Sequence, residues 1–199
     1  MSGMREWMSM PTTTGRVSAR ERLLAAADEL FYNEGVHTVG IDRIIEHAGV
    51  AKASLYNTFG SKDELIHAYL KGRQHQVAER IQVAVDAADT PREKVLAVFE
   101  GQIAVYAESG YQGCAFHRAS AESRPGDRID LTTREYRAWV RSLFTELAEQ
   151  AGAPDPVMLA TQLHMVFDGN GMATRNDRGP DSMPIARAAA TILLDAALN

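Results

Sequence analysis

The residues between Lys52 and Phe59 have types and a spacing that suit contacts with DNA. At 100° per residue along a helix, Leu55 and Phe59 fall within one narrow arc and must face the core. Ala53 and Asn57 then point most directly away from that core. A small side chain and a short amide allow close approach to base edges, and Asn57 can pair bidentately with adenine in the major groove.

Groups suited to phosphates lie beside this surface. Ser54 and Tyr56 fall on its two flanks, where their hydroxyl groups can reach phosphate oxygens. Lys62 belongs to the first turn of the following helix, whose free N-terminal amides also favour a phosphate. Arg16 is the basic group nearest to the start of the first helix. We therefore predict base contacts at the crest of this segment and backbone contacts at its edges.

Two short helices joined by a turn would hold these side chains in place. One apolar face recurs turn by turn in the first helix, at Ile41, Ile44, Ile45 and Ala48. Gly49 can end that helix, and a second helix follows over residues 52–59. Two short helices around a three- to four-residue turn with glycine form a helix-turn-helix, whose second helix enters the major groove. By spacing alone, the pattern also suits an ordinary helical hairpin.

Helix start signals recur along the rest of the chain. Capping boxes, in which a hydroxyl and a glutamate three residues later satisfy each other's amides, occur at 18–21, 61–64 and 90–93. The third opens one apolar stripe that continues to Tyr106. Asp155-Pro156 is a further start, and Gly169-Asn170-Gly171 is expected to kink or end the helix that begins there.

These signals predict an all-α fold with about nine helices. We expect a flexible N-terminal arm over residues 1–17 and a three-helix helix-turn-helix domain over 18–62. A helical bundle over 63–199 would bind an effector and form a dimer.

Composition limits the possible classes of protein. Charged residues make up 24% of the 199 positions, which excludes wholesale disorder, and the single cysteine excludes a disulfide framework. No apolar run is long enough to span a bilayer, so we expect a cytoplasmic protein without a membrane partner. Residues 1–75 hold 9 basic and 9 acidic side chains, so the net charge of −5 arises wholly after residue 75. Charge alone therefore neither demands nor excludes DNA.

Residues Ser18 to Leu70 resemble the N-terminal domain of the TetR family of bacterial transcriptional regulators. The resemblance is carried by Phe31, Gly35, Ile44, Ala48-Gly49-Val50, Leu55-Tyr56, Phe59, Ser61-Lys62 and Leu65. The family usually has Thr or Ser at the start of the second helix, where this chain has Val39-Gly40. It usually has Ser after Ala-Gly-Val, where this chain has Ala51, a poor N-cap.

The resemblance implies that Tyr56 and Lys62 contact phosphates and that the crest residues face the groove. It also implies a variable C-terminal domain that binds a small effector and dimerises. The full set of expected DNA contacts is Arg16, Arg43, Lys52, Ala53, Ser54, Tyr56, Asn57, Thr58 and Lys62.

Aromatic and mixed polar residues in the C-terminal part suit an apolar ligand cavity with a few polar groups. The candidates are Phe99, Ile103, Tyr106, Phe116, His117, Trp139, Leu143 and Met165. For any single one of them, simple core packing is a stronger explanation than ligand contact. Trp139 and Tyr106 are favoured because each needs a hydrogen-bond partner when buried.

A second function class rests on His117, His164 and Asp168. An all-α enzyme or a ligand-binding protein could use these side chains in a polar cavity, and an enzyme would require them to converge within hydrogen-bond reach. No nucleophile motif or phosphate loop accompanies them, so we expect no enzyme, no metal and no cofactor. Cys114 suits a structural thiol better than a redox sensor.

The last two helices are rich in small and apolar residues, which suits a two-helix contribution to a four-helix bundle across a two-fold axis. The expected interface residues are Leu159, Leu163, Val166, Ile185, Ala189, Ile192 and Leu193. The leading hypothesis is thus a homodimeric repressor that binds a palindromic DNA operator and is released by a small-molecule effector. A DNA-binding scaffold with a fully packed C-terminal core and no effector is the other alternative.

Overall fold

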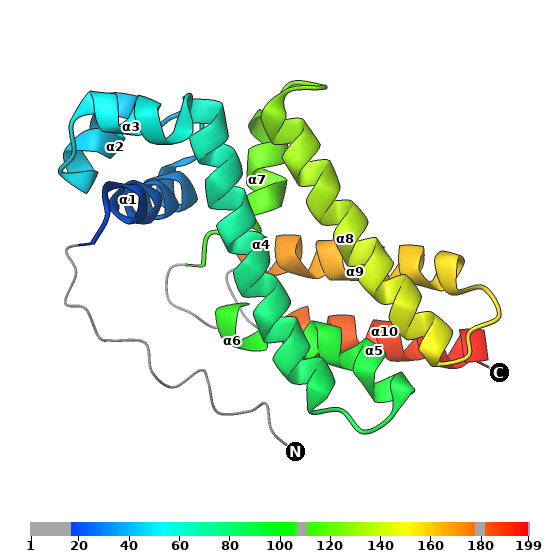
Figure 1. The fold of residues 1–199 in the computed structure, drawn as a ribbon. Coiled ribbons are helices and arrows are strands. Elements are labelled where there is room, and N and C mark those ends of the chain that lie inside the picture. The colour runs from blue at the N-terminus through cyan, green and yellow to red at the C-terminus, as the bar shows by residue number, and fades with distance from the viewer. Residues whose placement is uncertain (1–16, 107–110, 178–181, 199) are drawn as a thin grey trace, which may run out of the picture.

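The computed structural model describes residues 17–106, 111–177 and 182–198, and within these ranges it contains ten helices and no strand (Figure 1). The helices are α1 (Ala19–Glu34), α2 (Ile41–Ala48), α3 (Lys52–Phe59), α4 (Lys62–Asp86), α5 (Pro91–Glu100), α6 (Ile103–Tyr106), α7 (Ala115–Glu122), α8 (Arg128–Gln150), α9 (Pro156–Asp177) and α10 (Ser182–Leu198). The all-α prediction is confirmed. Arg16 and most of the expected N-terminal arm lie outside the described residues.

Helices α1–α3 form one end of the molecule (Figure 1). The predicted capping box starts α1, because the Ser18 amide donates to Glu21 at 2.8 Å and the Glu21 amide donates to Ser18 Oγ at 3.2 Å. Gly49 ends α2 with φ 61°, a left-handed conformation that glycine adopts without strain. Ala51 stands at the N-cap of α3 and supplies no side-chain hydrogen bond, as expected.

Helix α4 runs for 25 residues and crosses the expected boundary between the two domains without a break. Its start differs from the predicted capping box. The Ser61 hydroxyl accepts from the Glu64 amide at 3.1 Å, but the Glu64 carboxylate pairs with Arg128 of α8 at 3.0 Å. A charged partner on another helix has replaced the local amide as the partner of that carboxylate.

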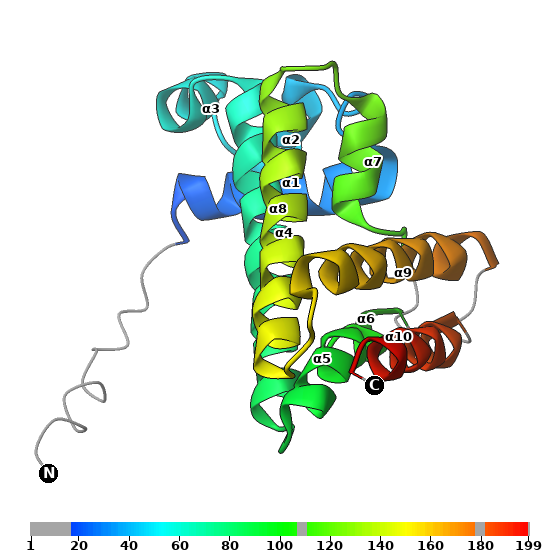
Figure 2. The same ribbon diagram turned by 90° about the vertical axis from the view of Figure 1, so that its right-hand side faces the viewer.

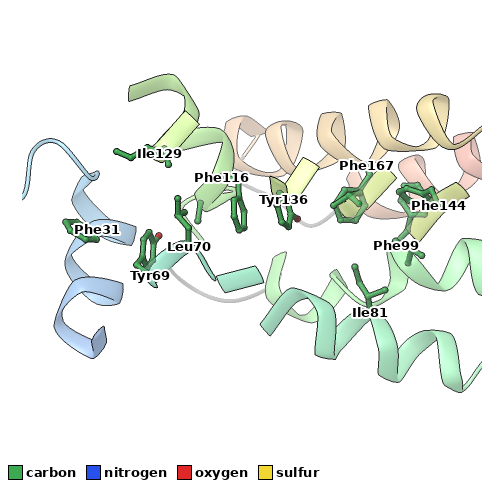
Figure 3. Close-up of a cluster of buried hydrophobic side chains, with 14 of the residues drawn as sticks. Phe31, Tyr69, Leu70, Ile81, Phe99, Phe116, Ile129, Tyr136, Phe144 and Phe167 are labelled. Atoms are coloured by element: carbon green, nitrogen blue, oxygen red, sulfur yellow. The ribbon is translucent and has the colours of Figure 1, made fainter. Parts of the chain in front are cut away.

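A continuous set of buried side chains joins the two ends of the molecule, from Phe31 in α1 to the aromatic cluster of the C-terminal part (Figure 3). Phe99, Phe144 and Phe167 meet there with ring centroids 5.7–6.0 Å apart. Tilted and edge-on rings at these distances add to the gain from burying their apolar area. Helix α9 packs against both α8 and α10, and α4 packs against α8 (Figure 2).

Two predicted helix ends are wrong. The stripe expected to run unbroken to Tyr106 is divided into α5 and α6 at Gly101, where an added Cβ would lie 2.9 Å from the Ile81 Cα of α4. Helix α9 does not end at Gly169-Asn170-Gly171 but continues through these residues to Asp177. Asn170 and Gly171 are buried there, so packing between α8 and α10 outweighs the weak helix propensity of glycine. None of the described helices is both long and apolar enough to span a bilayer.

Candidate DNA-binding surface and effector cavity

The crest of α3 is uncovered. Leu55 is fully buried beneath it, and Phe59 is half-buried with the Arg20 guanidinium 5.8 Å from its ring centroid. Ala53 and Asn57 are both exposed. The packing that the helical wheel requires is therefore present, and a convex surface is free to approach a duplex.

The other expected α3 contacts surround this crest. Tyr56 is 44% exposed, Ser54 is half-buried, and Lys52 and Thr58 are exposed. The Thr58 hydroxyl donates to the Ser54 carbonyl at 2.6 Å, so it turns back to its own helix in this conformation. Tyr56 thus offers the more accessible hydroxyl for a phosphate.

Carboxylates on the same chain pair with two of the expected cations. Lys52 Nζ lies 2.8 Å from Asp42 Oδ1, and this hydrogen bond raises the pKa of Lys52. Arg43 Nη2 donates to Glu34 Oε1 at 2.8 Å. Both pairs are solvent-exposed and therefore weak, so a phosphate can replace either carboxylate.

Lys62 differs from these cations because it is half-buried. Its Nζ lies 3.5 Å from the carbonyl oxygen of His37, and burial lowers its pKa. It is held at the N-terminus of α4, where the helix amides and the ammonium group can share one phosphate.

Arg22 positions the turn between α2 and α3, a role that the sequence reasoning missed. Its Nη1 donates to the carbonyl oxygens of Ala48 at 3.3 Å and Gly49 at 2.9 Å. The last carbonyls of α2 need donors from outside the helix, and a guanidinium is well suited to supply them. That need was visible in the sequence, but the donor is 26 residues away.

Helix α7 connects the DNA-binding end to the C-terminal part (Figure 2). Glu122, at its end, accepts from the His37 amide at 2.8 Å, and His37 Nε2 donates to the Glu122 carbonyl at 2.7 Å. Arg118 donates to the Tyr32 carbonyl of α1. The Tyr32 hydroxyl in turn accepts from the Gln112 amide at 3.1 Å. The segment before α7, the middle of α7 and its C-terminal end are therefore fastened to α1 and the loop that follows it.

A cavity lies next to these contacts, between α1, α4 and the C-terminal helices. Its free volume is about 60 Å³, which is room for several water molecules or a small ligand. Phe116 and Tyr136 stack along its wall, with centroids 3.6 Å apart and planes 4° apart. The lining residues are Tyr32, Arg73, Val77, Arg80, Gln102, Val105, Tyr111, Gly113, Cys114, Ala115, Phe116, His117, Tyr136, Phe167, Asp168 and Gly171.

The structure places the expected ligand residues in several environments. Phe116 and His117 line the cavity, whereas Phe99 packs in the aromatic cluster. Trp139 and Leu143 are half-buried and outside the lining. Ile103 and Met165 are 45% and 72% exposed, which is incompatible with a place in a central cavity. The side chain of Tyr106 lies outside the described residues.

Asp168 organises a polar cluster at the cavity wall. His117 Nε2 lies 3.1 Å from its Oδ1, His164 Nε2 lies 3.5 Å from its Oδ2, and Arg137 also pairs with Oδ2. Burial alone would raise the pKa of Asp168, but hydrogen bonds from the two histidines lower it far below its usual value. The carboxylate therefore stays ionised.

The three side chains required by the enzyme alternative do converge, but together with Arg137 of α8 they form a polar cluster that joins α7, α8 and α9. Within the described ranges, no group of three or more His, Cys, Asp or Glu residues is arranged to hold a metal ion. Cys114 is half-buried at the N-cap of α7, and burial raises the pKa of its thiol. A raised pKa disfavours the reactive thiolate.

The residues expected at a dimer interface also fall in different places. Leu159 and Leu163 are buried inside the protomer and do not reach its surface. Val166, Ala189 and Leu193 are half-buried. Ile185 and Ile192 are 71% and 69% exposed on α10.

The fold and the uncovered helix define an all-α protein that carries a helix-turn-helix. Residues 23–69 match the family model described as "Bacterial regulatory proteins, tetR family". The crystal structure of SCO4454, a TetR-family transcriptional regulator from Streptomyces coelicolor, is 33% identical. It superposes with a TM-score of 0.84 and covers 91% of this chain and 96% of its own. The chain belongs to the TetR family of DNA-binding transcriptional regulators, which are not enzymes.

Two curated relatives have named roles in transcription. The transcriptional activator FasR of Mycolicibacterium smegmatis is 35% identical over 85 residues, which is 43% of this chain and 39% of FasR. The transcriptional repressor KstR2 of the same organism is 24% identical over 159 residues, which is 74% of each chain. The first match therefore spans well under half of FasR, whereas the second spans most of KstR2.

Proposed function

We propose that the protein is a homodimeric repressor that binds a palindromic operator through α3 and leaves it when a small molecule fills the cavity. The observation that carries this proposal is the position of Tyr32. This residue belongs to α1 of the DNA-binding end, yet its side chain forms part of the cavity wall. A ligand there would touch the DNA-binding region directly.

An exposed apolar stripe on α9 and α10 supports dimerisation. Met158, Met165 and Met172 are spaced seven residues apart on α9 and are 56–72% exposed. Ile185 and Ile192 have the same spacing on α10, which packs beside α9 (Figure 2). Large apolar side chains gathered on two adjacent helices favour burial against a second copy as a four-helix bundle. The proposed interface therefore contains these methionines rather than Leu159 and Leu163.

A repressing role is supported by the extent of the relatives' matches. The similarity to the repressor KstR2 continues through most of both chains, whereas the similarity to the activator FasR covers 85 residues. The sign of regulation depends on more than the DNA-binding unit, so the longer match is the better guide.

Contacts of α7 offer a route from the cavity to the operator. Phe116 and His117 line the cavity near the start of α7, and Glu122 at its end holds both the amide and the ring of His37. The His37 carbonyl accepts from Lys62. A ligand that fits the cavity better when α7 is shifted would therefore favour a different placement of a phosphate-binding cation.

DNA binding can be tested with the DNA upstream of the protein's own gene in a gel-shift titration. Asn57→Ala should weaken operator binding roughly 5- to 150-fold and relax base preference, because a bidentate base contact is lost. Lys62→Ala should weaken operator and random DNA alike, because phosphate contacts carry no sequence information. Absence of a retarded band at micromolar dimer would overturn the proposal, and equal loss on both DNAs for Asn57→Ala would refute its role in base reading.

The α7 route predicts that Glu122→Ala lowers operator affinity about 5-fold, since the carboxylate that holds His37 is removed. Hydrogen exchange at the His37 amide should accelerate in the same variant. Glu146→Ala is the matched control, because Glu146 is an exposed glutamate on α8 away from this contact. Unchanged exchange at His37 would show that Glu122 does not hold the loop.

A further inference from the structure

Two polar atoms in the cavity have no partner among the described residues. Gln102 is only 4% exposed, and its Nε2 is buried without a hydrogen bond. His117 Nδ1 is also buried and unpartnered. Both residues line the cavity. Because more than about 90% of buried polar groups in proteins are paired, two orphans around one cavity point to an occupant that supplies their hydrogen bonds.

The two atoms require opposite kinds of partner. An amide nitrogen is a donor, so Gln102 Nε2 needs an acceptor. His117 Nε2 faces the ionised Asp168 at 3.1 Å, and a carboxylate can only accept, so the ring proton lies on Nε2. With a single proton on the ring, His117 Nδ1 presents a lone pair and needs a donor. An occupant must offer both a carbonyl-type oxygen and a hydroxyl-type proton.

The walls of the cavity select a flat, uncharged body between those two groups. Five of the 16 lining residues are Phe or Tyr, and the stacked pair of Phe116 and Tyr136 presents a rigid wall. The charges near the cavity are already satisfied. Arg73 lies 2.6 Å from Asp28 and over the Tyr32 ring, Asp168 has three partners, and Arg80 is also engaged within the protein. A charged ligand would have to compete with these protein partners for a counter-charge.

We propose that the cavity binds a small, uncharged single-ring aromatic compound that carries a carbonyl and a hydroxyl group. The carbonyl accepts from Gln102 Nε2, the hydroxyl donates to His117 Nδ1, and the ring lies among the aromatic side chains. The free volume of about 60 Å³ is less than a single ring needs, so the lining side chains must move apart to admit one ring, and a larger body is excluded. This inference rests on the proposed effector-responsive function and specifies the chemical class of the effector.

The three isomers of hydroxyacetophenone are suitable probes, with acetophenone lacking the hydroxyl and 4-ethylphenol lacking the carbonyl. Binding to the full chain is measured by isothermal titration calorimetry. At least one isomer should bind, and it should bind roughly 10-fold more tightly than either deletion compound, because each loses one hydrogen bond and leaves a protein atom unpaired.

Two variants connect each ligand group to its proposed partner. The His117→Phe variant should bind hydroxyacetophenone no more tightly than acetophenone, but still more tightly than 4-ethylphenol. The Gln102→Met variant should bind hydroxyacetophenone no more tightly than 4-ethylphenol, but still more tightly than acetophenone. His75→Phe and Gln82→Met are matched controls, since both residues are exposed on α4 and outside the lining. Melting temperatures verify that each variant is folded. If His117→Phe does not fold, Gln102→Met tests the carbonyl contact by itself.

The proposal is overturned if no isomer binds at millimolar concentration, or if the two variants leave the preference between compounds unchanged. In the first case, water is the occupant that pairs the two atoms. Operator binding without any added compound is measured on the same preparation. If only the ligand class is wrong, the protein still retards operator DNA but binds none of the compounds. If the regulatory function is wrong, the protein binds a compound but does not retard operator DNA. The two outcomes are therefore distinguishable.

Discussion

The DNA-binding surface and the cavity differ in how far apart their determinants lie along the chain. The crest of α3, its buried anchor Leu55 and the turn before it lie within about a dozen residues. The cavity is assembled from residues between Tyr32 and Gly171, contributed by most of the helices. A surface built locally can be changed one residue at a time, whereas a cavity built from distant segments depends on the packing of the whole molecule.

Removing a buried aromatic side chain should give the largest loss of stability. It tests whether the packing of the C-terminal part can be weakened without changing the DNA-binding surface. Phe144→Ala is expected to lower the free energy of unfolding by about 3–5 kcal/mol, since it empties part of the cluster with Phe99 and Phe167. At temperatures where the variant stays folded, operator affinity should be unchanged. Urea unfolding and gel shift measure the two quantities.

Leu55→Ala provides the contrast within the same comparison. It is expected to cost about 2–5 kcal/mol and also to weaken operator binding, because Leu55 is the anchor that orients the crest. Equal losses of operator affinity in the two variants would show that the regions are not separable in this way.

Asp168→Asn should have a smaller effect, about 1–3 kcal/mol, because it leaves two histidines and Arg137 without their shared carboxylate. The loss should depend on pH. The pKa of Asp168 is lowered in the fold, so its stabilisation is fully present above its ordinary value of 3.8 and is lost as the pH falls below that value.

The difference in unfolding free energy between the wild type and Asp168→Asn should therefore shrink as the pH falls from 5, and the two proteins should converge in more acidic solution. Asp155→Asn is a control carboxylate at the exposed start of α9. A difference that grows on acidification would contradict the sign of the shift.

Ala51→Ser should give the smallest effect and acts on the local region alone. Ala51 already has the extended backbone of an N-cap, with φ −72° and ψ 149°, but supplies no side-chain acceptor. A serine hydroxyl should stabilise the start of α3 by about 1 kcal/mol. Thermal unfolding should shift upward and hydrogen exchange in α3 should slow. Faster exchange in α3 would show that the new hydroxyl does not cap the helix.

The same contrast explains what could be predicted from the sequence. The bounds of α3 follow from Gly49, Gly60 and the arc shared by Leu55 and Phe59, all of which are local signals. Helical periodicity by itself therefore placed the crest residues on the correct face. Arg22 was missed because the carbonyls it satisfies belong to another helix.

Periodicity was insufficient for the C-terminal part because α9 is apolar on two sides. Leu159 and Leu163 face the core, while Met158 and Met165 face outward, and one helix pattern cannot tell which side meets the rest of the chain. The position of Tyr32 in the cavity wall could not be predicted from helical periodicity either. It depends on how α1 meets the segment before α7, a contact between residues 80 positions apart.

The carboxylate partners of Lys52 and Arg43 affect how the protein responds to ionic strength. In the proposed complex with DNA, each cation would arrive together with Asp42 or Glu34, so these two pairs would bring almost no net positive charge to the phosphates. Fewer condensed counterions are then displaced than the number of basic side chains suggests. Operator affinity should consequently decline gently as salt is added, and occupancy of the operator would persist through osmotic changes that dislodge a more strongly basic regulator.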